Sequence, residues 1–337
     1  MSAALIAVDG GGSKTDLALV GSDGALLSHV RGPQSALHRL GVDGSLEVVA
    51  ALLDRAAGEA GLELGNGPVA ELAQLLMTGV DFPREERALR RAVEARGWSR
   101  RTIVDNDTFA VLRAGTERGW GVAVVCGSGI NCVGVAPDGR HTRFPSLGAI
   151  TGDWGGGTDV GFAALYAAAR SEDGRGPRTS LERAVPAHFA LDTPQALAEA
   201  IHRGEIPGRR VAELPPVVFM EAARDAVAAG IVDRLAGEVI ALARVALERL
   251  DLVDEPAEVV LGGGMLQSSN GRLTATIEAG LREVGPSLLV KTAESHPIVG
   301  AVLLGLDELD AGDEARRRAR QELGERMRRK GKAGTDG

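Results

Sequence analysis

Apolar positions along the chain form short extended runs as well as longer helical faces. Segment 5–20 consists of two strand-like apolar runs separated by a glycine-rich turn, and segment 122–136 repeats this arrangement around a second such turn. An Asp-Gly pair follows each copy, Asp23-Gly24 in the first and Asp138-Gly139 in the second. This pair favours a hairpin because both positions tolerate positive φ. The pattern therefore predicts two similar β-hairpin units in separate halves of the chain.

The spacing of the other apolar positions predicts the remaining elements. In the first half we expect strands at 25–30, 72–80 and 102–104, and helices at 45–60, at 84–96 and from Phe109 onward. The resulting order, β-β-β-α-β-α-β-α, is typical of a mixed sheet flanked by helices. In the second half we expect helices at 160–170, 231–250 and 298–306, and a strand at 258–261.

The chain of 337 residues is long enough for two α/β domains, each a mixed β-sheet flanked by helices. The N-terminal domain is predicted to comprise residues 1–116 and a returning segment at about 297–312. Residues 117–296 are predicted to form the C-terminal domain, with a helical insertion at about 171–230. The charged segment 313–337 is expected to be a solvated helix that frays into disorder.

Charge and composition exclude several classes of partner. The net charge is −8 and the isoelectric point is about 5.4, which argues against nucleic acid or an anionic membrane as a partner. We find no apolar run long enough to span a bilayer, no signal peptide, and only two cysteines, so we expect a cytoplasmic protein without disulfides. No helix-turn-helix segment precedes the strand at Leu5, which argues against a DNA-binding repressor.

The first glycine-rich turn has a composition suited to binding phosphate. We call it loop 1; it consists of Gly10, Gly11, Gly12, Ser13, Lys14 and Thr15. It lies between two strands, whereas a Walker loop or a dinucleotide fingerprint opens a helix. Glycines allow backbone N–H groups to approach phosphate oxygens, and Asp9 could bind Mg²⁺ directly or through water. The alternative is an ordinary glycine hairpin.

Two further segments of the chain are also rich in glycine. Loop 2 consists of Gly127, Ser128 and Gly129, and loop 3 of Gly262, Gly263 and Gly264. The Ser128 hydroxyl can donate to a phosphate, and the Asn131 amide can donate to and accept from a polyol. Asn131 could equally be a turn residue.

Two aspartates are candidates for chemistry. Asp107 follows a predicted strand and could serve as the general base of a phosphoryl transfer, although Asp107 or Asp105 could also cap the next helix. Asp153 lies in a glycine-rich turn and could bind sugar hydroxyls or cap a helix. Cys126 and Cys132 are expected to be buried small residues in strands, and the six histidines show no metal-ligand spacing.

Together these motifs resemble the acetate kinase–hexokinase–actin–Hsp70 superfamily. Within it the chain resembles the BadF/BadG/BcrA/BcrD family, and most of all the eukaryotic-type N-acetylglucosamine kinases. DGGGSKT at 9–15 is similar to the first phosphate motif, GSGINC at 127–132 to the second, and LGGGM at 261–265 to the adenosine motif. GD at 152–153 is similar to the start of the kinases' GDEGS segment.

The resemblance implies two actin-like (ribonuclease H-like) domains with a nucleotide cleft between them. It also implies that ATP and Mg²⁺ are used to phosphorylate a hexose or amino sugar at its 6-hydroxyl. Asp107 falls at the catalytic aspartate, while Ser35, Asn131, Gly152 and Asp153 fall among the residues that contact the sugar. A homodimer is the expected assembly.

The sequence departs from these kinases around the expected sugar pocket. Segment 34–38 reads QSALH where the kinases have an STNHW-like segment, so Ala36 replaces an asparagine that contacts the sugar. Segment 145–148 reads PSLG where they have GGWG, and Trp154 replaces the Glu of GDEGS. Because Ala36 has no side-chain donor or acceptor, we expect no strong preference for N-acetylglucosamine over glucosamine or glucose.

Two other functions fit the same family resemblance. One is the ATPase activator of 2-hydroxyacyl-CoA dehydratases, which the resemblance implies would be a dimer bridging one [4Fe–4S] cluster with two cysteines per subunit. The number of cysteines permits this function, although both lie around loop 2, where the kinases also have a cysteine. The other alternative is a non-catalytic sugar sensor.

Overall fold

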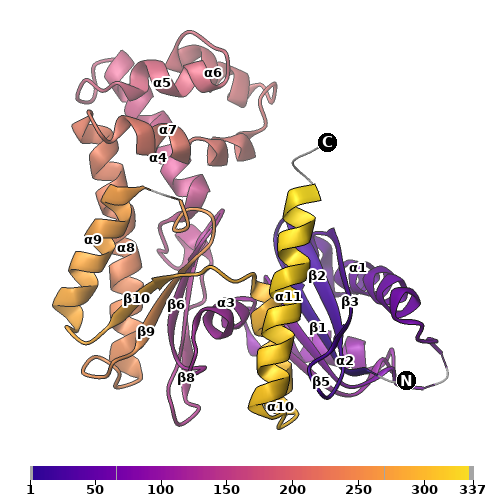
Figure 1. Ribbon diagram of the computed structural model, residues 1–337. Coiled ribbons are helices and arrows are strands. Elements are labelled where there is room, and N and C mark those ends of the chain that lie inside the picture. Colours follow the sequence, from indigo (N-terminus) through magenta and orange to yellow (C-terminus); the bar gives the residue numbers. More distant parts are fainter. Residues whose placement is uncertain (1–2, 66, 269, 334–337) are drawn as a thin grey trace. The chain divides into compact units, whose positions relative to one another are not determined.

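The computed structural model describes residues 3–65, 67–268 and 270–333 (Figure 1). The chain divides into two compact units. The first unit comprises the described residues up to Trp120 and those from Ala293 onward, and the second unit comprises Gly121–Thr292. The C-terminal segment of the chain thus returns to the first unit.

The first unit contains a mixed five-stranded sheet in the order β3-β2-β1-β4-β5. Strands β1, β2 and β3 are antiparallel neighbours, whereas β4 and β5 continue from β1 in parallel. Their bounds are β1 (Ala3–Gly10), β2 (Lys14–Val20), β3 (Leu26–Pro33), β4 (Ala70–Met77) and β5 (Ser99–Asp105).

Helices pack on both faces of this sheet. Ile6 and Val8 of β1 share a hydrophobic core with α1, and Leu5, on the opposite face, packs against Gly305 of α10. Because both faces are covered, the apolar run of β1 is nearly continuous rather than alternating. The helices are α1 (Leu37–Ala60), α2 (Pro83–Glu94), α3 (Thr108–Gly115), α10 (Pro297–Glu308) and α11 (Asp313–Ala333).

The second unit repeats the topology of the first. Its sheet has the order β10-β9-β6-β7-β8, in which β6, β7 and β8 are antiparallel and β9 and β10 are parallel to β6. The bounds are β6 (Gly121–Cys126), β7 (Ile130–Val135), β8 (His141–Arg143), β9 (Glu258–Gly262) and β10 (Leu289–Thr292). The two Asp-Gly pairs lie in the turns β2–β3 and β7–β8, as predicted. The prediction of two similar mixed sheets flanked by helices is therefore confirmed.

Most helices of the second unit lie between β8 and β9 in the sequence. The longest, α8, has Asp225 as its N-cap, and the Asp225 carboxylate accepts hydrogen bonds from the backbone N–H groups of Val227 and Ala228. These are the groups that a helix N-terminus leaves without an intrahelical partner. The helices are α4 (Gly156–Glu172), α5 (Leu181–His188), α6 (Pro194–His202), α7 (Pro215–Glu221), α8 (Ala226–Arg249) and, after β9, α9 (Gly271–Val284); short 3₁₀ turns lie at Gly148–Ile150 and Gly208–Glu213.

Some elements differ from the expectation. Helix α1 begins at Leu37, eight residues before the predicted start, and contains a kink at Gly41, whose φ is 66°. The apolar spacing that predicted the helix begins only beyond this kink. Strands β8 and β10 were not predicted because they are only three and four residues long and contain no buried residue. Helix α9 was also not predicted.

The C-terminal segment is more than a solvated helix. The side chains of Ala315, Ala319, Leu323 and Met327 are buried along one face of α11. The carboxylate of Glu322 accepts a hydrogen bond of 2.8 Å from the backbone N–H of Leu26 in the edge strand β3. The segment 313–337 was predicted to fray into disorder, but α11 is helical from Asp313 to Ala333, and residues 334–337 lie outside the described residues. None of the helices in the described ranges combines the length and the apolar character needed to cross a membrane.

Candidate active site

Polar residues of the first unit gather at the carboxyl ends of three neighbouring parallel strands. Asp9 lies at the end of β1, Thr78 directly follows β4, and Asp107 follows β5. The Thr78 N–H donates to the Gly10 carbonyl at 2.8 Å, and the Thr78 hydroxyl donates to the Asp107 carboxylate. The carboxyl edge of parallel strands is where α/β folds place ligands. The two candidate carboxylates thus lie on one edge of one sheet.

The side chain of Asp107 does not cap the helix that follows it. No capping hydrogen bond from the Asp107 side chain is formed at the start of α3, and the Asn106 side chain accepts the Thr108 N–H at 3.0 Å instead. Part of the Asp107 surface remains accessible. Desolvation of its carboxyl group nevertheless raises its pKa, and the hydrogen bond from Thr78 opposes this effect. A carboxylate that is partly accessible and has a raised pKa is suited to accept a proton.

Asp9 lies in an environment that disfavours its negative charge. Burial raises its pKa well above the ordinary value, and the neighbouring charges of Asp107 and Asp16 raise it further. The cations Lys14 and Arg31 act in the opposite direction but do not outweigh these effects. A buried carboxylate close to two others is a place where an added cation is stabilised.

A buried ionic cluster lies next to Asp9 in the sheet. Asp16 pairs with Asp9 in the register of β1 and β2, and its carboxylate lies 2.9 Å from both His29 Nε2 and Arg31 Nε. Burial is the largest single effect and would raise the pKa of Asp16, but the hydrogen bonds and charges of His29 and Arg31 together lower it. The sequence did not reveal this cluster, because its members lie on different strands and pair only through the sheet register.

Loop 1 connects β1 to β2 in a tight hairpin, and the Gly11 N–H donates to the Lys14 carbonyl at 2.9 Å. A Cβ at Gly10 would lie 2.3 Å from the Met77 sulfur, so a larger residue there would have to displace the buried Met77 side chain. Ser13 and Lys14 are exposed, whereas Thr15 is fully buried. The accessible part of loop 1 is therefore the segment from Gly11 to Lys14.

Ser35, expected to contact a sugar, is also fully buried. Its hydroxyl accepts a hydrogen bond of 2.7 Å from Thr15, so the two side chains bind each other. The segment around it lies beside loop 1, because Arg39 donates to the Gly12 carbonyl at 3.4 Å. The same segment contacts the strand end as well, because the Leu37 N–H donates to the Thr78 carbonyl. Ala36 is fully buried too.

In the second unit, the structure brings loops 2 and 3 together. The Met265 N–H donates to the Cys126 carbonyl at 3.1 Å, which places loop 3 against the residue that precedes loop 2. Gly263 has a φ of 83°, and a Cβ there would lie 2.3 Å from the Cys126 carbonyl oxygen. The Gly127 and Ser128 carbonyls accept N–H groups from Gly157 and Thr158 at the start of α4. Loop 2 itself is exposed and keeps its backbone accessible.

Two predicted sugar ligands of the second unit, Asn131 and Asp153, have side chains bonded to nearby hydroxyls. Asn131 Oδ1 accepts a 2.6 Å hydrogen bond from Ser146, and the Asp153 carboxylate accepts one from Thr151. Asp153 does not cap α4, which begins at Gly156 and has Gly155 as its N-cap, without a side-chain cap. Gly152, with a φ of 81°, forms the turn before Asp153 and is exposed.

Trp154, which we compared from the sequence with the Glu of a GDEGS segment, follows Asp153 in this loop. The Arg234 guanidinium lies over the Trp154 ring, 4.0 Å from its centroid, in a cation–π contact. An aromatic ring in this position cannot accept hydrogen bonds as a carboxylate does. The chemistry of this loop therefore differs from that of a GDEGS segment.

The first unit has a donor set that fits Mg²⁺. Among residues 3–65, 67–268 and 270–333, no three His, Cys, Asp or Glu side chains converge as a metal cluster. Mg²⁺ in phosphoryl-transfer sites, however, uses one or two carboxylates together with water and substrate phosphates. Asp9 fits this role because its buried carboxylate lies in the repulsive field of Asp107.

Both cysteines are buried in the sheet of the second unit. Cys126 in β6 and Cys132 in β7 have no exposed surface. Burial raises the pKa of the Cys126 thiol to about 12 and that of Cys132 above its usual value. This confirms the prediction that they are buried strand residues. Inaccessible, protonated thiols are poorly placed to ligate a cluster shared between subunits.

The residues that sequence reasoning missed are those that support the carboxylates. Thr78 orients Asp107, and Asn106 donates to both the Val80 carbonyl and the Asp81 carboxylate. A signal for Thr78 existed, because it is a polar residue at the end of a buried apolar strand. No comparable signal existed for Asn106, which the pattern did not distinguish from a turn residue.

Comparison with solved structures defines the class of fold. The chain superposes on a structure from Chromobacterium violaceum, provisionally called an N-acetylglucosamine kinase, with a TM-score of 0.71 and 28% identity over 90% of this chain and 99% of that one. A ROK hexokinase from Thermus thermophilus, at 20% identity, gives a TM-score of 0.55 over 91% and 99% of the two chains. The protein thus has the actin-like fold of sugar kinases.

The chain belongs to the BadF/BadG/BcrA/BcrD ATPase family, whose model matches residues 6–305. It is 26% identical to the N-acetylmuramic acid/N-acetylglucosamine kinase of Clostridium acetobutylicum, over 91% of this chain and 99% of that protein. It is also 26% identical to the N-acetyl-D-glucosamine kinase of Dictyostelium discoideum, over 90% and 97% of the two chains. The family predicted from the motifs is therefore confirmed.

Proposed function

We propose that this protein is an ATP-dependent kinase that phosphorylates a hexose or amino sugar at its 6-hydroxyl, with Asp107 as the general base. The observation that carries the proposal is the pair of carboxylates, Asp9 and Asp107, at one carboxyl edge of the first sheet beside loop 1. The names of the relatives support a substrate of the N-acetylglucosamine type.

In this proposal the Asp107 carboxylate accepts the proton of the sugar hydroxyl. The hydroxyl oxygen forms the new bond to the γ-phosphorus, and the bond from that phosphorus to its bridging oxygen breaks, so that ADP leaves with the electron pair. The raised pKa of Asp107 supports this role, because a more basic carboxylate accepts a proton more readily. The hydrogen bond from Thr78 keeps the carboxylate oriented.

The glycine loops of both units are proposed to bind the phosphates of ATP. Loop 1 offers its accessible segment, Gly11–Lys14, and loop 2 offers exposed backbone that the start of α4 holds in place. Loop 3 is proposed to contact the adenosine. Asp9 would hold Mg²⁺, which when bound neutralises charge on the phosphate oxygens.

The sugar is proposed to bind near Asn131, Gly152 and Asp153. Thr15 was expected to bind phosphate and Ser35 to contact the sugar. In this proposal neither side chain contacts a ligand, because the Thr15 hydroxyl donates to the Ser35 hydroxyl. Ala36 is buried and has no polar side-chain atom, so it cannot supply the contact that an asparagine would make. Ser146, whose hydroxyl donates to Asn131 in the second unit, is the alternative polar contact that we consider.

A sugar panel tests the proposed substrate class. We expect Mg²⁺-dependent ADP release to require a sugar, with N-acetylglucosamine, glucosamine and glucose all accepted and the product phosphorylated on the 6-oxygen, as identified by ³¹P NMR. The kcat/KM values should differ by less than about a hundredfold, because a site without a dedicated polar contact discriminates weakly. A larger preference for N-acetylglucosamine would show that Ser146 or another residue compensates for Ala36. ADP release that no sugar stimulates would contradict the kinase proposal.

A further inference from the structure

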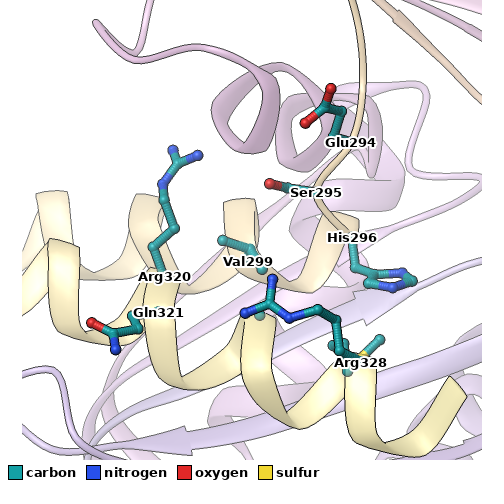
Figure 2. A pocket seen from close by; sticks show the side chains of 9 residues that line it. Glu294, Ser295, His296, Val299, Arg320, Gln321 and Arg328 are labelled. Atoms are coloured by element: carbon teal, nitrogen blue, oxygen red, sulfur yellow. The ribbon is translucent and has the colours of Figure 1, made fainter. Parts of the chain in front are cut away.

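A cavity of about 410 Å³ lies within the first unit, between the start of α10 and the C-terminal half of α11. Figure 2 shows that Arg320, Gln321 and Arg328 extend from α11, while Glu294, Ser295 and His296 lie on the segment that leads into α10. Val299 and Met327 supply apolar surface. A volume of this size accommodates a small organic ligand.

One wall of the cavity lies outside the part of the chain that the family model matches. That match ends at residue 305, whereas α11 spans Asp313–Ala333. None of the residues placed in the proposed active site lines the cavity. The cavity is therefore a feature of this chain's C-terminal helix rather than part of the glycine loops.

The cationic groups of the cavity are two arginines from the same helix. Arg320 is fixed in position, because its guanidinium donates to the Ala114 and Thr116 carbonyls at 3.0 and 3.3 Å. Arg328 is exposed, and no carboxylate in the described ranges forms an ion pair with it. Guanidinium groups match phosphate oxygens in geometry and charge. The two arginines thus offer one anchored and one adaptable group to a phosphate.

The remaining polar groups are suited to hydroxyls. Glu294 and Ser295 provide acceptors and a hydroxyl donor, and Gln321 provides an amide whose nitrogen also donates to Glu325 at 3.1 Å. The apolar surface of Val299 and Met327 can pack against the C–H face of a sugar ring. Burial and then the charges of Lys14 and Arg31 lower the pKa of His296, which disfavours its protonated form.

We propose that this cavity binds a phosphorylated polyol of the sugar-phosphate type, with the phosphate on Arg320 and Arg328 and the hydroxyls on Glu294, Ser295 and Gln321. The site is distinct from the proposed active site and does not depend on the kinase activity. Its ligand is of the chemical class to which the proposed product belongs.

The test is isothermal titration of the full-length protein, without ATP, using glucose 6-phosphate and inorganic phosphate as separate probes. The variant is Arg328→Gln. The matched control is Arg329→Gln, which removes the same charge from the neighbouring residue, a side chain that is 82% exposed and does not line the cavity. Melting temperatures of both variants establish that the fold is intact.

We expect glucose 6-phosphate to bind the wild type and Arg329→Gln equally, and Arg328→Gln to bind it about 10- to 100-fold more weakly, the effect of one charge-assisted hydrogen bond. We also expect Mg²⁺–ATP not to displace it and the KM for ATP to be unchanged in Arg328→Gln. Three results would overturn the proposal: equal binding by Arg328→Gln, no binding by the wild type at millimolar ligand, or displacement by ATP. Inorganic phosphate binding as tightly as glucose 6-phosphate would overturn the polyol part.

Discussion

At the scale of single residues, the hydrogen bond from Thr78 to Asp107 sets the properties of the proposed base. This bond favours the ionised carboxylate, whereas burial favours the protonated form. The balance between the two decides the pH at which Asp107 becomes able to accept a proton. Thr78 touches no reacting atom in the proposed reaction, so we regard it as a positioning residue.

We predict that Thr78→Val shifts the acidic limb of the kcat/KM profile to higher pH. Removal of the hydroxyl leaves burial unopposed, so the pKa of Asp107 rises and a higher pH is needed to ionise it. The plateau should fall by much less than the ~10²–10⁴-fold typical of losing a general base. Thr78→Ser, which keeps the hydroxyl, should restore the profile. An unchanged acidic limb in Thr78→Val would show that Thr78 does not influence the pKa of Asp107.

We predict that the ionised Asp9 carboxylate lowers the free energy of unfolding of the metal-free protein, and that the same carboxylate binds Mg²⁺. Its folded-state pKa is raised above the unfolded value, so its ionisation destabilises the fold once the pH exceeds the unfolded pKa of about 3.9. Asp9→Asn should therefore raise the melting temperature at pH 7, and this gain should disappear when the pH falls below about 3.9. Mg²⁺-dependent activity should fall at the same time. Full activity, or a lower melting temperature at pH 7, would contradict the role given to Asp9.

At the scale of elements, the sequence predicts the strands and turns that have a local signal, and it misses those that depend on contacts with other parts of the fold. The long apolar runs and the two Asp-Gly turns identified β1–β3 and the hairpin of β6 and β7 because each signal is local. The short strand β8 lacks an apolar run and follows β7 only through the turn at Asp138-Gly139, whereas β10 pairs with β9, which lies about 30 residues earlier in the chain. Helix α1 was found only beyond the kink at Gly41.

The C-terminal helix α11 shows the same limit. Its many charges predicted solvation, and most of those charges are indeed paired or exposed at the surface. The four apolar residues on its inner face are too sparse to stand out in the sequence, yet they pack into the first unit. Only the fold reveals that this helix covers the edge strand β3, where Glu322 binds the Leu26 N–H.

We predict that Leu323→Ala destabilises the protein by about 2–5 kcal/mol, the usual cost of removing a fully buried leucine side chain. Urea unfolding at equilibrium measures this change. Arg317→Ala, on the exposed side of the same helix, is the control and should change stability by no more than about 0.5 kcal/mol. Equal stabilities for the two variants would show that α11 is a solvated appendage after all.

At the scale of the whole molecule, the duplicated topology is the feature that sequence predicts best. Both sheets have three antiparallel strands followed by two parallel ones, and the glycine loops lie at corresponding ends of β1 and β6. Asp9 and Asp107 could be selected from the sequence because each stands at the end of a predicted strand, and their roles in the site stay predictions. Their surroundings were not, because Thr78 and the Asp16–His29–Arg31 cluster come together only through strand pairing.

The central proposal is that Asp107 is the general base of an ATP-dependent sugar kinase. The turnover of Asp107→Asn tests this role most directly. Sugar-dependent ADP release should fall by ~10²–10⁴-fold, the contribution of a general base, because an amide cannot accept the hydroxyl proton. Binding of ATP and sugar, measured by calorimetry on the same variant, should remain close to that of the wild type. Turnover within a few-fold of the wild type would contradict the assignment.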